Sequence, residues 1–221
     1  MITLAIDAST YAGDVAVLDG VNVLAEECVE MKCAERERLM PAVASVLNRA
    51  GVETQDIQRV VCGAGPGSFT SLRIAAAIAK GMASGVGCPL FAVPSMALIL
   101  GGTNLNRGRY LIAVNALRGE FYVGLYVIES DWSIAELERA RLVDAADIVG
   151  LAAEHNVTIV CSSPFPDAAT ATPRSSAVSR MEGILRERGP VALDGWEPAY
   201  GRLAEAQVRW ECAHGRPLPV K

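Results

Sequence analysis

Short apolar runs at the start of the chain alternate with turn residues. The runs lie at residues 4–10, 15–18 and 21–25, and Gly13 and Gly20 fall between them. Apolar runs of this length, bounded by glycine and aspartate, are typical of strands joined by tight turns. We therefore predict a β-meander that opens the fold.

The next stretch, residues 34–50, has helical instead of strand-like spacing. Its apolar positions recur every three or four residues, at Leu39, Val43, Val46, Leu47 and Ala50. Pro41 suits the first turn of a helix, and Gly51 is a typical stop signal. We predict an amphipathic helix here.

A strand, a glycine-rich stretch and a second helix come next. The apolar run 59–62 precedes glycine-rich residues 63–73, and an alanine-rich run with helical spacing covers 74–86. A strand at 90–93 and a short helix capped by Ser95 should follow, ending at the polar residues 101–104.

The pattern of the first residues then returns. A strand is predicted at 110–114, a turn at 118–120 and a strand at 121–128. Ala5-Ile6-Asp7-Ala8 is echoed by Ala113-Val114-Asn115-Ala116, so Asn115 stands where Asp7 stood. The repeat predicts a duplicated β-hairpin core.

We place a domain boundary in the polar, glycine-containing stretch 101–108. Residues 1–104 would form a first subdomain and residues 105–221 a second, shorter and degenerate one. In the second we predict a helix capped by Asp144 that ends near Glu154, a strand at 157–161, a long mobile polar loop through Pro173, and a helix at 176–188.

The glycine-rich stretch is the segment that composition explains least. Gly63, Gly65 and Gly67 indicate backbone that something approaches closely, and Pro66 stiffens the loop. Ser68 or Thr70 can cap the helix that follows, whose free N–H groups favour an anion or carboxylate, with Arg73 one turn further on. This loop is a ligand or partner platform, or only a tight strand-to-helix turn. It does not match a P-loop, because no lysine lies between the glycines and Lys80. It does not match a Rossmann fingerprint, because Ser68 stands where that pattern has its third glycine and residues 88–93 offer no acid.

Composition and charge narrow the class of protein. No apolar run reaches the ~20 residues of a membrane-spanning helix, and Met1 to Asp7 lacks the basic region of a secretory signal. We expect a soluble cytoplasmic protein that does not contact membranes. A formal net charge of −5 argues against binding nucleic acid unaided.

Metal and disulfide chemistry find little support in the sequence. The six cysteines include no C-x-x-C pair, which favours reduced, mostly packed thiols. The two histidines, His155 and His214, have no second ligand at metal spacing. We predict no metal and no cofactor.

Four stretches resemble one known family across nearly the whole chain. They read Leu4-Ala5-Ile6-Asp7-Ala8-Ser9-Thr10, Gly65-Pro66-Gly67-Ser68-Phe69-Thr70-Ser71-Leu72-Arg73-Ile74, Ala116-Leu117-Arg118-Gly119-Glu120-Phe121-Tyr122 and Pro198-Ala199-Tyr200-Gly201-Arg202. The chain resembles the TsaB (YeaZ) family, in which the second string is specific. The resemblance implies an α/β, duplicated ribonuclease-H-like fold of the actin-like ATPase and sugar kinase superfamily, with two subdomains of mixed sheet plus helices.

The resemblance also implies a function. Members of this family are non-catalytic dimerisation subunits of the bacterial machinery that forms N6-threonylcarbamoyladenosine beside the anticodon of tRNA. The catalytic partner is TsaD, which forms a heterodimer with the TsaB subunit, and the ATPase TsaE is the third member. We expect no catalytic residue in this chain, a homodimer when it is alone, and contact with tRNA only through the complex.

Two ridges on the helix after the glycine-rich stretch suggest where a partner docks. Ser71, Ala75, Ala79 and Ala83 form a small-residue ridge beside a larger one of Ile74, Ile78, Met82 and Val86. A second apolar stripe suggests a second buried surface, although the chain's own sheet and first helix could cover both ridges. Given the family, the predicted docking residues are Leu39, Val43, Leu47, Ser71, Ala75, Ile78, Ala79 and Met82.

A second predicted site is a degenerate nucleotide-type or loop site. Its residues are Asp7, Ser9, Thr10, Gly65, Gly67, Ser68 and Arg73. Ser71, Asn115 and Glu35 depart from the family pattern of glycine, aspartate and histidine, which weakens the case for independent chemistry.

Three alternatives stay open on the sequence alone. A small ATPase or phosphotransferase would use Asp7 and a metal, but Asn115 leaves the matching turn neutral; Asp7 is equally well interpreted as a turn residue that accepts backbone N–H bonds. A glycoprotease-like metallopeptidase would need a histidine motif that is missing. A plain interaction protein without a tRNA connection is the third.

Overall fold

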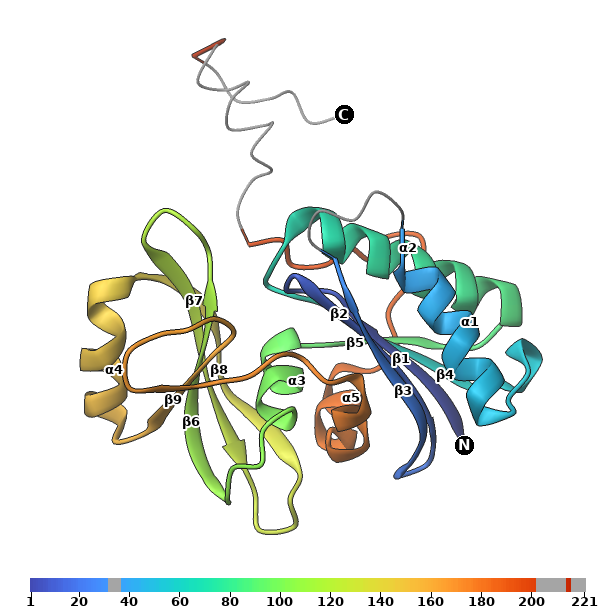
Figure 1. Cartoon of the computed structure of the whole chain (residues 1–221), viewed down its shortest axis with the longest axis horizontal. Coiled ribbons are helices and arrows are strands. Elements are labelled where there is room, and N and C mark those ends of the chain that lie inside the picture. Colours follow the sequence, from blue (N-terminus) through green and yellow to red (C-terminus); the bar gives the residue numbers. More distant parts are fainter. Residues whose placement is uncertain (32–36, 202–213, 216–221) are drawn as a thin grey trace.

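The computed structural model describes residues 1–31, 37–201 and 214–215. Two five-stranded sheets form the frame of the molecule (Figure 1). The first has the order β3-β2-β1-β4-β5, and the second has the order β10-β9-β6-β7-β8. The first-sheet strands are β1 (Ile2–Asp7), β2 (Ala12–Asp19), β3 (Asn22–Glu30), β4 (Arg59–Gly63) and β5 (Leu90–Val93). The second-sheet strands are β6 (Gly108–Asn115), β7 (Glu120–Ile128), β8 (Ile134–Asp144), β9 (Thr158–Cys161) and β10 (Ala168–Thr170).

The two sheets repeat one topology. In each, three antiparallel strands come first in the chain, and two further strands add in parallel on the side of the first strand. Asp7 ends β1 and Asn115 ends β6, so the tetrapeptide echo marks equivalent strands. The predicted duplicated ribonuclease-H-like fold is confirmed.

Helices cover the outer faces of both sheets and fill the space between them (Figure 1). Helices α1 (Leu39–Ala50) and α2 (Phe69–Val86) pack on the first sheet, and α4 (Ile148–His155) packs on the second. Helices α3 (Ser95–Gly101) and α5 (Glu182–Arg188) lie between the sheets. Short 3₁₀ turns precede three of the helices: η1 (Thr54–Asp56) comes before α2, η2 (Ala145–Asp147) before α4 and η3 (Ser175–Arg180) before α5.

A single core joins the two sheets. It combines Ala5 and Val61 of the first sheet, Met96 and Leu98 of α3, and Tyr126 of the second sheet with residues of η3 and α5. The chain also returns to the first sheet after β10: the amide of Val191 donates to the carbonyl of Leu90 at 2.8 Å. The division at residues 104 and 105 separates the two sheets but stays a prediction about folding units.

Several sequence-based boundaries need correction. Strands β8 and β10 were not predicted, because β8 is an edge strand with many exposed polar side chains and β10 is only three residues long inside the polar loop. Asp144 holds the N-cap position of the 3₁₀ turn at 145–147 that leads into α4 at Ile148, but its side chain makes no cap hydrogen bond. Ser95 is not the cap of α3, because Pro94 holds that N-cap position. The helix predicted at 176–188 is divided at Met181 into η3 and α5.

The first helix begins at its first apolar position and later than the predicted range of 34–50. Helix α1 starts at Leu39, where the Glu37 carboxylate accepts the backbone N–H groups of Leu39 and Met40. The beginning of the predicted range, including Glu35, lies outside the described residues. In the described part of the chain, no helix combines the length and apolar character that crossing a membrane requires.

Candidate functional site

The glycine-rich loop between β4 and α2 lies against the turn that follows β1. The backbone N–H of Ser68 donates to the carbonyl of Ser9 at 2.7 Å. A Cβ atom on Gly67 would lie 2.0 Å from that carbonyl oxygen, and one on Gly63 would lie 1.8 Å from Oδ2 of Asp7. Glycine is therefore required at both positions: Gly67 meets the backbone of Ser9, and Gly63 meets the side chains of Asp7 and Ser95, without room for a side chain of its own.

Asp7 joins the loop to two other elements. Its fully buried carboxylate accepts the backbone N–H and the hydroxyl of Ser9, both at 2.8 Å, and the hydroxyl of Ser95 at the start of α3. The Ser95 oxygen in turn accepts the N–H of Gly65 at 2.9 Å. Burial raises the pKa of Asp7, and the hydrogen bonds from Ser95 and Ser9 oppose this shift. The carboxylate thus has structural partners on both oxygens, as the turn-residue interpretation expected.

The other predicted loop residues divide between this cluster and the surface. Thr10 bonds the backbone of Ala12 at 3.1 Å. Ser68 occupies the N-cap position of α2, but its hydroxyl lies 3.0 Å from that of Ser71 and bonds no backbone N–H, so the predicted side-chain cap is wrong for Ser68. Arg73 is exposed, with its guanidinium 5.5 Å from the centre of the Phe69 ring.

The chain's own late segment covers part of the loop, which the sequence did not reveal. The N–H of Ala199 donates to the carbonyl of Ala64 at 2.8 Å, and a Cβ atom on Gly65 would lie 2.6 Å from the Ala199 oxygen. The ring of Tyr200 packs against Phe69 with their centroids 4.5 Å apart. These contacts give a physical reason for the family-like string at 198–201, whose only sequence signal was that resemblance.

Six of the eight predicted docking residues lie inside the chain's own core. Leu39, Val43, Leu47, Ser71, Ala75 and Ala79 are all buried, and only Ile78 and Met82 are half-buried. The small-residue ridge of α2 therefore faces the first sheet, as in the alternative that both ridges are covered within the chain. This ridge does not face outward, and a partner cannot contact it directly in this conformation.

The outward face of α2 carries a different set of small residues. Ala77, Gly81 and Gly85 are exposed at successive i, i+4 positions, and Cβ atoms on both glycines would meet nothing within 4 Å. Ile78 and Met82 flank this ridge. We call Ala77, Ile78, Gly81, Met82 and Gly85 the outer ridge.

Ionisable groups suited to catalysis are sparse. In residues 1–31, 37–201 and 214–215, no group of three or more His, Cys, Asp or Glu side chains could hold a metal ion. Asn115, which stands where Asp7 stood, accepts the N–H of Leu117 at 2.7 Å as a turn residue does. Burial raises the pKa of the Cys62 thiol, so this cysteine is not an activated nucleophile.

Comparison with known proteins places the chain among relatives of one kind. The family model described as "TsaD: tRNA N6-adenosine threonylcarbamoyltransferase" matches residues 30–160. The tRNA threonylcarbamoyladenosine biosynthesis protein TsaB of Bacillus subtilis is 30% identical over 227 residues, covering 95% of this chain and 98% of the relative. The Escherichia coli protein of the same name is 37% identical over 130 residues, covering 57% of this chain and 55% of the relative.

Solved structures agree on the fold. YeaZ from Pseudomonas aeruginosa superposes with a TM-score of 0.71 and 23% sequence identity, covering 90% of this chain and 99% of that one. Because the Bacillus relative matches along nearly its whole length, the chain belongs to the TsaB (YeaZ) family.

Proposed function

We propose that this chain is a non-catalytic subunit of the complex that forms N6-threonylcarbamoyladenosine in tRNA. Its role would be to support a TsaD-like catalytic partner in a heterodimer, with a TsaE-like ATPase as third member and tRNA bound only through the complex. Family membership and the names of the relatives support this role. The match to the TsaD family model is consistent with a partner of similar fold.

The lack of independent chemistry rests on Asp7. An acid that binds a metal or activates a nucleophile must be reachable, but Asp7 is fully buried and both of its oxygens accept hydrogen bonds from Ser9 and Ser95. This favours a supporting subunit over the ATPase alternative.

The outer ridge is the surface that we assign to docking, in a homodimer when the chain is alone and in the heterodimer otherwise. Exposed small residues at i, i+4 spacing let the backbone of a second helix approach closely, and the half-buried Ile78 and Met82 supply apolar area beside them. Met40 and Ala44 are exposed on α1, the helix that contacts α2. The outer ridge replaces the inward ridge of Ala75 and Ala79 as the proposed contact.

Ala77→Arg tests this assignment, with Ala153→Arg as matched control. Both alanines are exposed on helices, but Ala153 lies on α4 of the second sheet. A charge buried without a partner costs about 3–5 kcal/mol, so Ala77→Arg should weaken binding to a TsaD-like subunit more than a hundredfold and Ala153→Arg should not.

The measurements are calorimetric titration and the formation of the modified nucleoside in the reconstituted system. Thermal melts of both variants should match that of the unmodified chain. Equal binding by the two variants would remove docking from the outer ridge. Modification of tRNA by the chain without its partner would contradict the non-catalytic role.

A further inference from the structure

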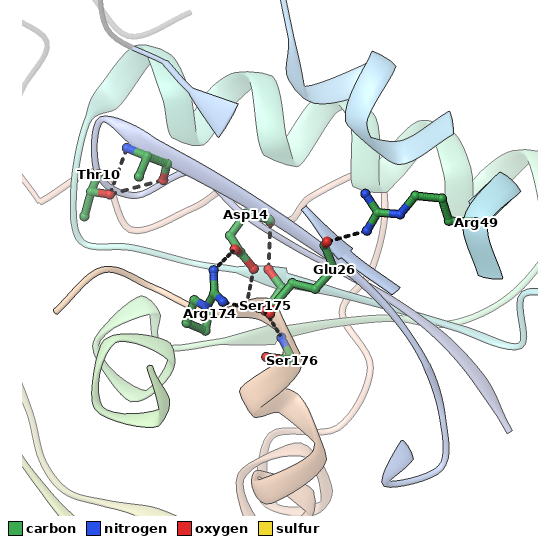
Figure 2. Close-up of polar contacts among 8 residues, drawn as sticks. Thr10, Asp14, Glu26, Arg49, Arg174, Ser175 and Ser176 are labelled. Atoms are coloured by element: carbon green, nitrogen blue, oxygen red, sulfur yellow. Dashed lines mark hydrogen bonds and ion pairs between the residues drawn. The ribbon is translucent and has the colours of Figure 1, made fainter. Parts of the chain in front are cut away.

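Residues 171–191 run from the end of β10 in the second sheet back to β5 in the first, and we call them the return segment. Two carboxyl groups of the first sheet bind this segment (Figure 2). Asp14 on β2 accepts the backbone N–H of Ser175 at 2.6 Å, and Glu26 on β3 accepts that of Ser176 at 3.2 Å. The Ser175 hydroxyl donates to the carbonyl of Asp14 at 2.7 Å. We call Asp14, Glu26 and residues 174–176 the clasp.

The two carboxyl groups are neighbours on one face of the sheet. Asp14 pairs with Cys28 in the register of β2 and β3, while Ala16 pairs with Glu26. Asp14 and Glu26 are therefore diagonal neighbours on the same face, within reach of each other. The Asp14 side chain is fully buried and that of Glu26 is 17% exposed.

A single guanidinium faces both carboxyl groups. Arg174 lies 3.2 Å from Glu26 but 3.5 Å from Asp14, which is at the limit of a hydrogen bond. Figure 2 shows its side chain beside the two acids, with its contacts drawn as dashed lines. Because the guanidinium lies closer to Glu26, it stabilises a negative charge on Asp14 less than one on Glu26.

The other ionisable groups near the clasp do not neutralise the negative charge of Asp14 and Glu26. Burial and the charge of Asp14 raise the pKa of the Cys28 thiol, so it is neutral. Asp7, the register partner of Asp14 on β1, is bonded to Ser9 and Ser95. Arg49 of α1 contacts the main-chain carbonyl of Glu26 and the carboxylate of Glu27.

Two acids with one cation in a buried site favour a shared proton, because like charges at close range cannot both be desolvated cheaply. Burial is the main cause that raises the pKa of Asp14 to about 7. The bond from Ser175 opposes this shift, the charge of Glu26 adds to it, and Arg174 lowers it again.

We propose that Asp14 and Glu26 hold one proton between them, carried by Asp14 and donated to Glu26, and that its loss loosens the grip of the first sheet on residues 174–176. The clasp is thus a pH-sensitive latch for the return segment. This inference concerns a different part of the molecule from the outer ridge and does not depend on the proposed function.

The direction of the pH effect follows from the sign of the shift. The pKa of Asp14 is about 7 in the folded chain and about 3.9 in an unfolded one. The folded state therefore binds more protons between these values, so this stabilisation is complete below about pH 4 and is lost as the pH rises through 7. The unfolding equilibrium constant should gain about tenfold per pH unit from Asp14 between about pH 5 and 6.5.

Chemical denaturation of the full chain from pH 5 to 8.5 tests the latch. Asp14→Asn imitates the protonated acid, because its amide oxygen can accept from Ser175 and its NH₂ can donate to Glu26. Asp14→Asn should lose the tenfold-per-unit slope. Glu26→Gln should keep the slope but end it at a lower pH, because the charge of Glu26 adds to the raised pKa of Asp14 while burial remains its main cause. Glu27→Gln, a carboxylate of β3 that pairs with Arg49 outside the clasp, should keep the slope unchanged. A full slope in Asp14→Asn would overturn the proposal.

Amide hydrogen exchange tests the same idea without any variant. Protection of the Ser175 and Ser176 amides, corrected for intrinsic rates, should fall by about tenfold more between pH 6 and 8 than that of Val191, which bonds Leu90 in the same segment. Equal changes at the three amides would overturn the latch, because the pH effect would then not be local to the clasp.

Discussion

At the scale of single residues, close approach between backbone segments determines what the glycine-rich loop can contain. The Cα of Gly63 packs directly against the Asp7 carboxylate, and that of Gly67 packs directly against the backbone of Ser9. The loop is therefore fixed from three directions, by β1, by the turn after it and by α3.

Gly63→Ala should destabilise the chain strongly. Its Cβ would lie 1.8 Å from Oδ2 of Asp7, whose carboxylate cannot move without losing its bonds to Ser9 and Ser95. Overpacking of this kind costs about 1–3 kcal/mol. Gly81→Ala on the open face of α2 is the control, and it should stabilise by about 0.5–1 kcal/mol because alanine favours a helix. Urea denaturation measures both, and equal stability of the two variants would contradict the packing.

The sequence predicted some of these residues for the right reason. The three glycines indicated a close approach, and Asp7 after a strand indicated a turn acceptor. The link to Ser95 could not be found in this way, because the two residues are 88 positions apart and the tertiary fold alone brings their side chains together. The clasp was missed for the same reason: Asp14 and Ser175 are 161 positions apart.

At the scale of elements, α2 shows what the periodicity of apolar residues can and cannot predict. The spacing of apolar residues predicted the helix and both of its ridges. It could not decide which ridge faces inward, because both ridges are apolar and helical spacing alone gives no direction. Ala75, Ala79 and Ala83 turn toward the sheet, where small side chains let the helix axis approach the strands.

Ala79→Leu and Ala77→Leu separate the two faces of α2. Ala79 is fully buried against the first sheet, so three added carbons should overpack the core and lower the free energy of unfolding by about 1–3 kcal/mol. Ala77 is exposed, and its variant should stay within about 0.5 kcal/mol of the unmodified chain. Thermal melts compare them. A stable Ala79→Leu would mean that this ridge is not internal.

Strand β8, in contrast to α2, was not predicted from the sequence pattern at all. It is the longest strand described, yet six consecutive exposed residues, 137–142, hide any alternation. Charged side chains on an edge strand protect its free hydrogen-bonding groups from pairing with other chains. The same charges remove the apolar signal by which strands are recognised.

At the scale of the whole molecule, the return segment connects the two sheets through the ion pairs of α5. Arg59 on β4 is almost buried, bonds Thr3 at 3.1 Å and pairs with Glu182 of α5 at 2.9 Å. Arg188 at the other end of α5 pairs with Glu136 of β8. Helix α5 thus connects both sheets. The duplication could be predicted from local repeats, but this connection could not, because it depends on pairs far apart in the sequence.

The shared core predicts that the chain unfolds in one cooperative transition. The core between the sheets includes residues of β1, α3, β6, β7 and α5, so neither sheet can unfold without exposing apolar surface of the other. Trp132 follows β7, and Trp196 packs against the core of the first sheet. Two single-tryptophan variants, with the other tryptophans replaced by phenylalanine, report on each side by fluorescence. Their thermal midpoints should coincide, and calorimetric and van't Hoff enthalpies should agree. An earlier transition at Trp132 would show that the second sheet is an independent folding unit.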